Sequence, residues 1–377
     1  MRDAVIVEAV RTPVGKRNGA LSGIHPADLS ARVLNELVER AGVEPGDVDD
    51  VVWGCVSQAG EQAGNIARTS VLAAGWPESV PATSVDRQCG SSQQAVHAAA
   101  AGVLAGYYDI AVAGGVESMS RVPMGFARKG VDKVLPDSVL DRYGVKGFNQ
   151  GIGAEMVAEK WGFSRQQVDE YSLSSHAKAA AAIDSGALDG QLVKLPELEA
   201  DEGVRRGGSL ESLGKLKTAF REDGVVTAGN ASQISDGSGA LLITTSDIAR
   251  ERGLRPMARV HTAVLAGDDP VMMLSAPWPA THKALRKAGL GIDDIGAFEV
   301  NEAFAPVPLA WLAETGADPA RLNPLGGAIA VGHPLGGSGA VLMTRLVHHM
   351  RANGIRYGLQ TMCEGGGMAN ATILELL

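Results

Sequence analysis

Two cysteines and one histidine stand in glycine-rich turns of this chain, and together these residue types could carry out nucleophilic catalysis. Cys89 is followed directly by a glycine, Cys363 comes shortly before a run of three glycines, and His333 lies within a Gly-His-Pro sequence. Cysteine supplies a nucleophile, and histidine supplies a base that activates it. Glycines let backbone N–H groups come close to a reacting oxygen. The pattern predicts a catalytic site built from these residues.

Cys89 is the candidate nucleophile. It follows an extended segment, residues 82–86, and precedes a helix predicted over residues 91–105. The positive end of a helix dipole and its unpaired N–H groups favour a thiolate at such a position. The alternative is a buried and unreactive cysteine, which is the usual state of free cysteine. A strand-to-helix turn with Gly90 and two serines is a poor core site, so we favour the nucleophile.

His333, Cys363 and Asn301 are the candidate partners of Cys89. A lone histidine is more often structural, but the run at residues 323–334 that contains His333 is unlike a core strand. This run also lacks the Gly-Lys-Ser/Thr of a phosphate-binding loop. Cys363 ends a strand and could move a proton, while N–H groups such as that of Gly365 stabilise an oxygen. Asn301 either caps a helix or holds a water or substrate oxygen. No metal site is expected, because Cys363 has no ligand-type neighbours in sequence.

The segments that must position these residues occur in two similar halves. Each half contains a helix with a glycine stop, a strand entry, a glycine-rich turn that leads into a second helix, and a following strand. The corresponding segments are residues 34–54 with 89–117, and residues 283–300 with 333–367. Alternating strands and helices predict an α/β fold with mainly parallel sheets covered by helices. The duplication predicts two such layers related by a pseudo-two-fold axis.

The α/β alternation is interrupted between residues 118 and 232, which we interpret as an insertion over the first half. It contains a helical hairpin, predicted over residues 155–161 and 166–185, with a cap at Ser164. The predicted organisation is therefore an N-terminal half, residues 1–250, that includes this insertion, and a C-terminal half, residues 255–377. The helix at residues 91–105 has no charged residue, so it is expected to be buried on all sides.

Composition excludes several classes of protein. The 377 residues carry a net charge of −9, which disfavours non-specific nucleic-acid binding. Residues 118–232 are nearly neutral, so the insertion is basic relative to the rest. This is typical of a solvated surface or of a contact with a phosphate-bearing ligand. No apolar run is long enough to span a membrane. Three widely spaced cysteines and the absence of a signal-peptide pattern predict a protein of the reducing cytoplasm.

Together these motifs resemble the thiolase family over essentially the whole chain. The Cys89, His333 and Cys363 turns carry the resemblance, together with Arg-Thr-Pro-Val-Gly-Lys, Thr-Ala-Gly-Asn-Ala-Ser and Asn-Glu-Ala-Phe at residues 11–16, 227–232 and 301–304. The resemblance implies the five-layered αβαβα thiolase fold, a homodimer or homotetramer, and acyl-CoA and CoA as the molecules bound. Coenzyme A is then a substrate, and no permanently bound cofactor is implied.

The resemblance also implies residue roles. Cys89 would accept the acyl group, His333 would activate it, and Cys363 would exchange a proton with C2 of acetyl-CoA. Asn301 would hold a water that forms one oxyanion hole with His333, and the N–H groups of Cys89 and Gly365 would form the other. Arg205, Ser212 and Ser232 match positions that contact CoA from the insertion.

Departures from the family pattern narrow the expected substrate. Acetoacetyl-specific biosynthetic members have an aromatic-His-Met where this chain has Phe148-Asn149-Gln150. The sequences at residues 86–94, 232–237 and 362–367 are most similar to actinobacterial thiolases of steroid-ring and fatty-acid breakdown. Glu364 and the pair Ala369-Asn370 are less usual than the common pattern.

The sequence therefore predicts a degradative thiolase of β-oxidation type. It would cleave a 3-oxoacyl-CoA with CoA to give a shortened acyl-CoA and acetyl-CoA. One alternative is a biosynthetic acetyl-CoA C-acetyltransferase that runs the same residues as a Claisen condensation. The other is a non-catalytic acyl-CoA carrier or assembly subunit, which the complete Cys/His/Cys set argues against.

Overall fold

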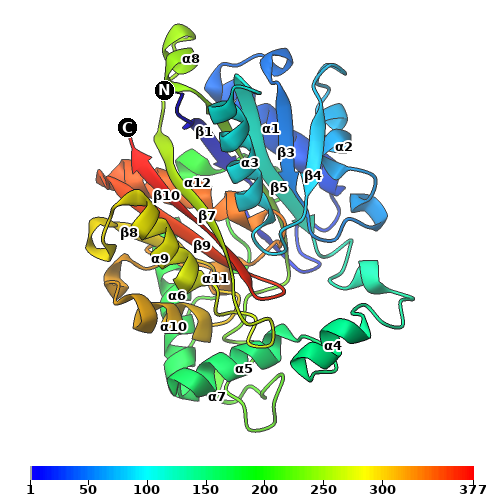
Figure 1. Cartoon of the computed structure of the whole chain (residues 1–377), viewed down its shortest axis with the longest axis vertical. Coiled ribbons are helices and arrows are strands. Elements are labelled where there is room, and N and C mark those ends of the chain that lie inside the picture. Colours follow the sequence, from blue (N-terminus) through cyan, green and yellow to red (C-terminus); the bar gives the residue numbers. More distant parts are fainter. Residues whose placement is uncertain (1) are drawn as a thin grey trace.

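Two halves of one mixed β-sheet form the framework of the molecule, which is seen here in a computed structural model that describes residues 2–377 (Figure 1). The order of the main strands is β4-β3-β5-β6-β1-β7-β10-β9-β8, and β2 pairs with β6. The strands are β1 (Val5–Arg11), β2 (Gly15–Lys16), β3 (Asp50–Gly54), β4 (Ala82–Val85), β5 (Ile110–Ser118), β6 (Ser235–Thr244), β7 (Ala258–Gly267), β8 (Ala297–Val300), β9 (Tyr357–Glu364) and β10 (Met368–Leu376). β1 pairs with β7 only at Val5–Arg259 and Ile6–Ala258, so the halves meet along a short seam.

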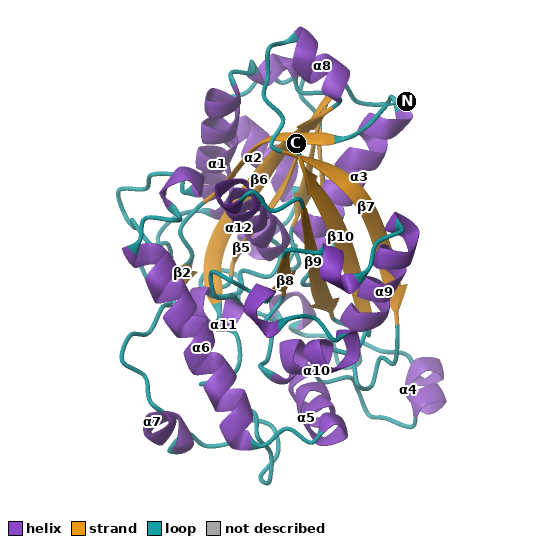
Figure 2. Cartoon of the chain, turned by 90° about the vertical axis from the view of Figure 1, so that its left-hand side faces the viewer, coloured by secondary structure: helices purple, strands orange, loops and turns teal. Residues whose placement is uncertain are grey.

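Helices cover the outer faces of both halves and fill the space between them. The helices are α1 (Pro26–Ala41), α2 (Ile66–Ala73), α3 (Ser91–Ala105), α4 (Asp137–Tyr143), α5 (Gln150–Trp161), α6 (Arg165–Asp184), α7 (Leu210–Gly214), α8 (Ser246–Glu251), α9 (Pro277–Ala288), α10 (Pro306–Thr315), α11 (Ala328–Val331) and α12 (Ser338–Asn353). α1 and α2 pack on the N-terminal half, α9 and α10 on the C-terminal half, and α3 and α12 against each other (Figure 2). This arrangement is the five-layered αβαβα architecture that the sequence predicted.

The prediction that the strands are mainly parallel is wrong. Parallel pairs join β3 to β4, β3 to β5 and β8 to β9. The remaining pairs, including β5–β6, β1–β6 and β7–β10, are antiparallel. The physical reason is clearest for β9 and β10, because three glycines connect them as a hairpin and a connection this short cannot cross over to a parallel partner.

The prediction that α3 is buried on all sides is only partly right, because most of the helix is buried but the face that carries Leu104 is open, with that side chain 47% exposed. Ala95, Ala99 and Val103 of α3 lie in one apolar cluster with Met343 and Leu346 of α12. A Cβ atom on Gly339 of α12 would collide with the backbone nitrogen of Gln93 in α3. The two helices can therefore approach this closely only because residue 339 is glycine.

The inserted segment leaves the sheet at the end of β5 and returns at the start of β6, and it contains α4, α5, α6 and α7, which lie at the lower end of the molecule in Figure 1. Ser164 caps α6 in a capping box with Gln167, as predicted. The preceding helix begins at Gln150 rather than residue 155, because the Asn149 side chain accepts hydrogen bonds from the N–H groups of the first turn.

A buried ion pair fastens the insertion to β1. The Arg11 guanidinium donates two hydrogen bonds to the carboxylate of Asp201, with N–O distances of 2.7 and 3.0 Å. Both side chains are fully buried. The geometry is bidentate, which is the strong form of an arginine–carboxylate pair. Within residues 2–377, no helix is long and apolar enough to cross a membrane.

Candidate active site

A tight turn between β4 and α3 presents Cys89 at the start of the central helix. The backbone of Gln88 has a positive φ of 48°, and the N–H of Arg87 donates to Ser91 Oγ at 2.9 Å. These features reverse the chain within a few residues. The cysteine is only 5% exposed and lies among apolar side chains that include Met119, Leu335, Leu342 and Met362. The predicted strand-turn-helix placement of Cys89 is confirmed.

Hydrogen bonds to Ser338 fix the tautomer of His333. The imidazole Nδ1 lies 2.6 Å from Ser338 Oγ, and this hydroxyl donates its proton to the carbonyl oxygen of Pro334 at 2.9 Å. Since a hydroxyl has one proton, Nδ1 must carry the proton of the ring and donate it to Oγ. Nε2 then carries no proton, and its lone pair faces the side-chain amide of Asn301, so the ring is in the form that a general base requires. Burial lowers the pKa of His333 to about 4, so the ring is neutral at neutral pH.

Asn301 joins the histidine to the second cysteine. Its Nδ2 lies 3.4 Å from His333 Nε2, and its side chain also hydrogen-bonds the thiol of Cys363. Its Oδ1 is buried and has no hydrogen-bond partner within the described residues, so it can accept from a water or a substrate. Asn301 is not a helix cap, because α10 begins only at Pro306.

Both candidate thiols are neutral in the resting protein. Burial, together with the neighbouring Cys363 and Glu364, raises the pKa of Cys89 far above its usual value, whereas a hydrogen bond with Gln150 lowers it by less. Burial raises the pKa of Cys363 to about 12. The expectation that the helix N-terminus favours a thiolate at Cys89 is therefore wrong for the resting site. Loss of water and nearby acidic groups outweigh the dipole, and the thiolate must form by proton transfer to a base.

The structure brings together Cys89, His333, Asn301 and Cys363, which lie in separate parts of the chain. Cys363 lies close enough to Cys89 to raise the pKa of the Cys89 thiol, and Asn301 contacts both Cys363 and His333. Gly365 also faces the nucleophile turn, because a Cβ atom added to it would lie 2.9 Å from Gln88 Oε1. The arrangement provides a nucleophile, a neutral base and a second proton donor around one point.

The three residues expected to contact CoA lie on the insertion or at its end. Arg205 is exposed, and its backbone N–H donates to His176 Nδ1 at 3.1 Å. Ser212 is exposed, and its hydroxyl donates to the Ser209 carbonyl in the first turn of α7. Ser232 is half-buried, and its N–H donates to the Ala303 carbonyl. The Arg205 guanidinium is thus accessible to a ligand, while the Ser212 hydroxyl already serves the helix cap.

Glu117 is a buried carboxylate that the sequence reasoning missed. It ends the central strand β5 and accepts hydrogen bonds from the N–H groups of Val56, Ser57 and Gly336, at 2.8 to 3.0 Å. It therefore ties the loop after β3 to the glycine-rich segment that follows His333. An acidic residue that ends a fully apolar strand was the available sequence signal.

Glu302, next to Asn301, is a second buried carboxylate, and it ties the insertion to the site by accepting hydrogen bonds. Its oxygens accept from the hydroxyls of Tyr171 and Ser175 on α6, at 2.8 and 2.7 Å, and from the N–H of Ile329 at 3.1 Å. One carboxylate thus links the insertion, the turn that follows β8 and the segment that leads to His333. Its partners are distant in sequence, so no local pattern reveals them.

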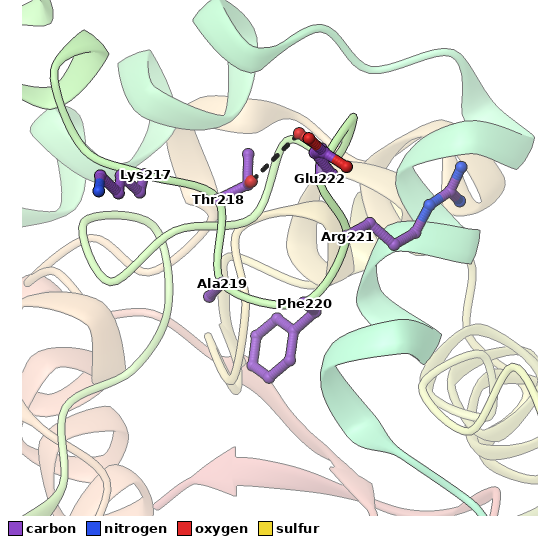
Figure 3. A pocket seen from close by; sticks show the side chains of 6 residues that line it. All are labelled: Lys217, Thr218, Ala219, Phe220, Arg221 and Glu222. Atoms are coloured by element: carbon purple, nitrogen blue, oxygen red, sulfur yellow. Dashed lines mark hydrogen bonds between the residues drawn. The ribbon is translucent and has the colours of Figure 1, made fainter.

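Two cavities in the insertion are separate from the cysteine site. Figure 3 shows the first, an open pocket of about 570 Å³ lined by the loop Lys217–Glu222, in which the Thr218 hydroxyl donates to the Glu222 carbonyl. The second, of about 200 Å³, lies between α5 and Arg221. Neither is lined by Cys89, His333 or Cys363.

Comparison with known proteins agrees with the geometry of the site. Residues 4–247 match the family model of the thiolase N-terminal domain, and residues 254–376 match that of the thiolase C-terminal domain. The chain is 50% identical to the steroid 3-ketoacyl-CoA thiolase FadA6 of Mycobacterium tuberculosis, covering 100% of this chain and 95% of that protein. It is 41% identical to a 3-ketoacyl-CoA thiolase of Aliivibrio fischeri, with both chains fully covered.

A solved structure gives the same result for the fold. The Bacillus anthracis acetyl-CoA acetyltransferase superposes with a TM-score of 0.91 at 38% identity, covering 100% of this chain and 99% of that one. Two family models that together span nearly the whole sequence, and relatives well above 30% identity over their full lengths, leave one conclusion. The chain belongs to the thiolase family.

Proposed function

We propose that this thiolase is degradative and uses CoA to cleave a 3-oxoacyl-CoA into a shortened acyl-CoA and acetyl-CoA. The names of its relatives support this direction, since most of those compared are 3-ketoacyl-CoA thiolases. The observation that carries the proposal is the connection of a neutral His333, through Asn301, to a neutral Cys363 beside Cys89. With these residues, Cys89 and His333 can form an acyl-enzyme, and Cys363 can separately transfer a proton to or from a carbon atom of the substrate.

The first half-reaction breaks the carbon–carbon bond. His333 Nε2 takes the proton of the Cys89 thiol, and the sulfur attacks C3 of the substrate. The C2–C3 bond breaks, its electron pair moves to C2, and Cys363 gives its proton to C2. Acetyl-CoA leaves, and the remaining acyl group stays on Cys89. The N–H groups of Cys89 and Gly365, and a water held by Asn301 with His333, would stabilise the oxygens that gain charge.

The second half-reaction transfers the acyl group to CoA. The Cys363 thiolate takes the proton of the CoA thiol, whose sulfur attacks the thioester on Cys89. The Cys89 sulfur leaves and recovers its proton from His333. Each proton donor is thereby restored, and splitting the reaction into two steps avoids one difficult step.

CoA is proposed to bind along the insertion, as a substrate and with no permanently bound cofactor. Arg205, Ser212 and Ser232 are the proposed contacts. Arg205 is exposed and has no acidic partner within the described residues, which suits a phosphate contact, whereas the adjacent Arg206 already pairs with Asp184 at 2.7 Å. We also propose the division into residues 1–250, with the insertion 118–232, and residues 255–377, a homodimer or homotetramer, and a cytoplasmic location.

The proposed acyl group is bulky and of steroid-ring or fatty-acyl origin. The 50% identity to a protein named as a steroid thiolase supports a steroid-ring origin. The similarity to proteins named 3-ketoacyl-CoA thiolase supports a fatty-acyl origin. Gln150 in place of methionine puts an amide beside the Cys89 sulfur, which differs from the acetoacetyl-specific pattern. The biosynthetic alternative has support in relatives named acetyl-CoA acetyltransferase at 40% and 38% identity.

A substrate panel tests the proposal. Cleavage in the presence of CoA is measured for acetoacetyl-CoA, a long-chain 3-oxoacyl-CoA and a cyclic 3-oxoacyl-CoA. The proposal expects a higher kcat/KM for the two bulky substrates. Efficient turnover of acetoacetyl-CoA alone would favour the biosynthetic alternative, and no turnover of any substrate would favour a carrier.

A further inference from the structure

Glu364, which directly follows Cys363 at the end of β9, is a buried carboxyl group without a visible role in the reaction. Its side chain is fully buried, and neither oxygen has a hydrogen-bond partner within the described residues. Removing an ionised carboxylate from water without donors is strongly unfavourable. The group is therefore expected to hold a proton, and burial raises its pKa to about 8.

The carboxyl group of Glu364 lies directly behind the nucleophile turn. A Cβ atom on Gly90, the residue after Cys89, would collide with Glu364 Oε1 and would lie 2.6 Å from Asn370 Nδ2. Asn370 Nδ2 donates to the Gly90 carbonyl at 2.9 Å, so this amide already holds the turn. Glu364 and Asn370 therefore meet the turn from the neighbouring strands β9 and β10.

The same region contains more acceptors than donors. Asn370 Oδ1 is buried and has no hydrogen-bond partner in the described chain, like both oxygens of Glu364. A proton on Glu364 converts one of these acceptors into a donor and reduces the deficit. Buried polar groups are nearly always paired, so the protonated form is the one that fits this packing.

The charged and titratable groups around Glu364 act in opposite directions. Arg87 in the nucleophile turn favours the carboxylate, whereas Asp86 disfavours it. A negative charge on Glu364 also raises the pKa of Cys89 and of Cys363. α3, which follows the turn, brings no charged residue. Ionisation of Glu364 and formation of either thiolate are thus mutually unfavourable.

We propose that Glu364 is a positioning residue of the thiolase reaction, whose neutral carboxylic acid supports the Cys89 turn and whose carboxylate form blocks ionisation of the two thiols. The inference rests on the proposed roles of Cys89 and Cys363. The proposal predicts that the site is active only while Glu364 is protonated. The enzyme should then lose activity on the alkaline side, where an ordinary thiol enzyme would form more thiolate.

The pH profile of Glu364→Gln tests this inference, because glutamine is neutral at every pH and has nearly the same shape. For the unmodified protein we expect kcat/KM to fall about tenfold per pH unit above the pH at which Glu364 ionises. For Glu364→Gln we expect activity within about tenfold of the original at pH 7, and the alkaline fall displaced upward by at least about one pH unit. Glu8→Gln is the matched control, since Glu8 on β1 also has a pKa raised by burial but contacts Ala9 instead of the site. An alkaline fall at the same pH in all three proteins would overturn the proposal.

Alkylation of Cys89 by iodoacetamide gives a readout independent of cleavage and of the variant's folding. In the unmodified protein, the labelling rate should rise by clearly less than tenfold per pH unit while Glu364 ionises, because the new charge opposes the thiolate. A full tenfold rise per unit through this range would contradict the role of Glu364. Failure of the proposed function looks different, because the unmodified protein would then cleave no 3-oxoacyl-CoA at any pH.

Discussion

The residues of the candidate active site are neutral at rest, so the proposed reaction requires proton transfer between them. Burial holds His333 as a neutral base, since its pKa falls to about 4, and holds Cys89 and Cys363 as thiols. The base form of the histidine therefore persists throughout the neutral range. What selects Nε2 as the basic nitrogen is the Ser338 hydroxyl, which accepts from Nδ1 and donates to the Pro334 carbonyl.

At the residue scale, we predict that Ser338→Ala lowers kcat by about 10- to 100-fold with little change in KM. The hydroxyl does not touch substrate, and its loss frees the ring to adopt the other tautomer; orienting groups of catalytic histidines have effects of this order or larger. Steady-state kinetics measure both constants. Ser338→Thr, which keeps the hydroxyl, should recover most of the rate. If the alanine variant instead raises only KM, Ser338 does not act through the histidine.

The elements of the fold were predicted well where the signal is local. The charge-free run at residues 91–105 gave the bounds of α3, and the serine cap located the start of α6. The first helix of the predicted hairpin, α5, begins five residues before its predicted start, because Asn149 caps it there. Strand directions were misjudged, since whether a connection crosses over or turns back depends on distant packing.

The candidate site was predicted in its residue types but not in its electrostatics. The glycine-rich turns around Cys89, His333 and Cys363 pointed to three side chains that the structure brings together, and their roles remain predictions. The pKa of Cys89 depends on burial and on Cys363 and Glu364, which are distant in sequence and approach it only in the folded chain. For the same reason, the supporting contacts of Glu117 and Glu302 could not be predicted.

At the element scale, we predict that Gly339→Ala destabilises the protein by about 1–3 kcal/mol, the usual cost of overpacking. The new methyl group would collide with the backbone of α3 at Gln93, and either helix must shift. The free energy of unfolding is measured with urea. Gly23→Ala is the control, because a Cβ atom there meets nothing within 4 Å. Equal stability of the two variants would show that the α3–α12 contact is looser than described.

The whole molecule combines a duplicated sheet, which presents the reactive residues, with an insertion proposed to hold CoA. The catalytic groups come from both halves: Cys89 follows β4 in the first, while His333 and Cys363 belong to the second. Arg11 and Glu302 attach the insertion to the N-terminal and C-terminal halves by buried polar contacts. CoA binding is therefore assigned to the insertion and catalysis to the two halves of the sheet, and buried polar contacts connect these parts.

At the scale of the whole molecule, we predict that Arg205→Ala raises the KM for CoA by roughly 5- to 30-fold with little change in kcat. A remote phosphate contact holds the ground and transition states about equally, and an exposed charge-assisted contact contributes about 1–2 kcal/mol. Arg206→Ala should leave KM nearly unchanged, because Arg206 pairs with Asp184 at the surface. Indistinguishable KM values for the two variants would remove Arg205 from the CoA site.

The most direct test of the account separates the tasks of the two cysteines. Intact-protein mass spectrometry after mixing with a simple acyl-CoA measures acylation, and a cleavage assay with 3-oxoacyl-CoA measures carbon–carbon bond breaking. Cys89→Ala should do neither, because no sulfur remains to carry the acyl group. Cys363→Ala should still gain one acyl group but lose cleavage by a factor of about 10²–10⁴, the usual contribution of general acid–base catalysis. Acylation of Cys89→Ala, or cleavage by Cys363→Ala at the unmodified rate, would contradict the proposed division of roles.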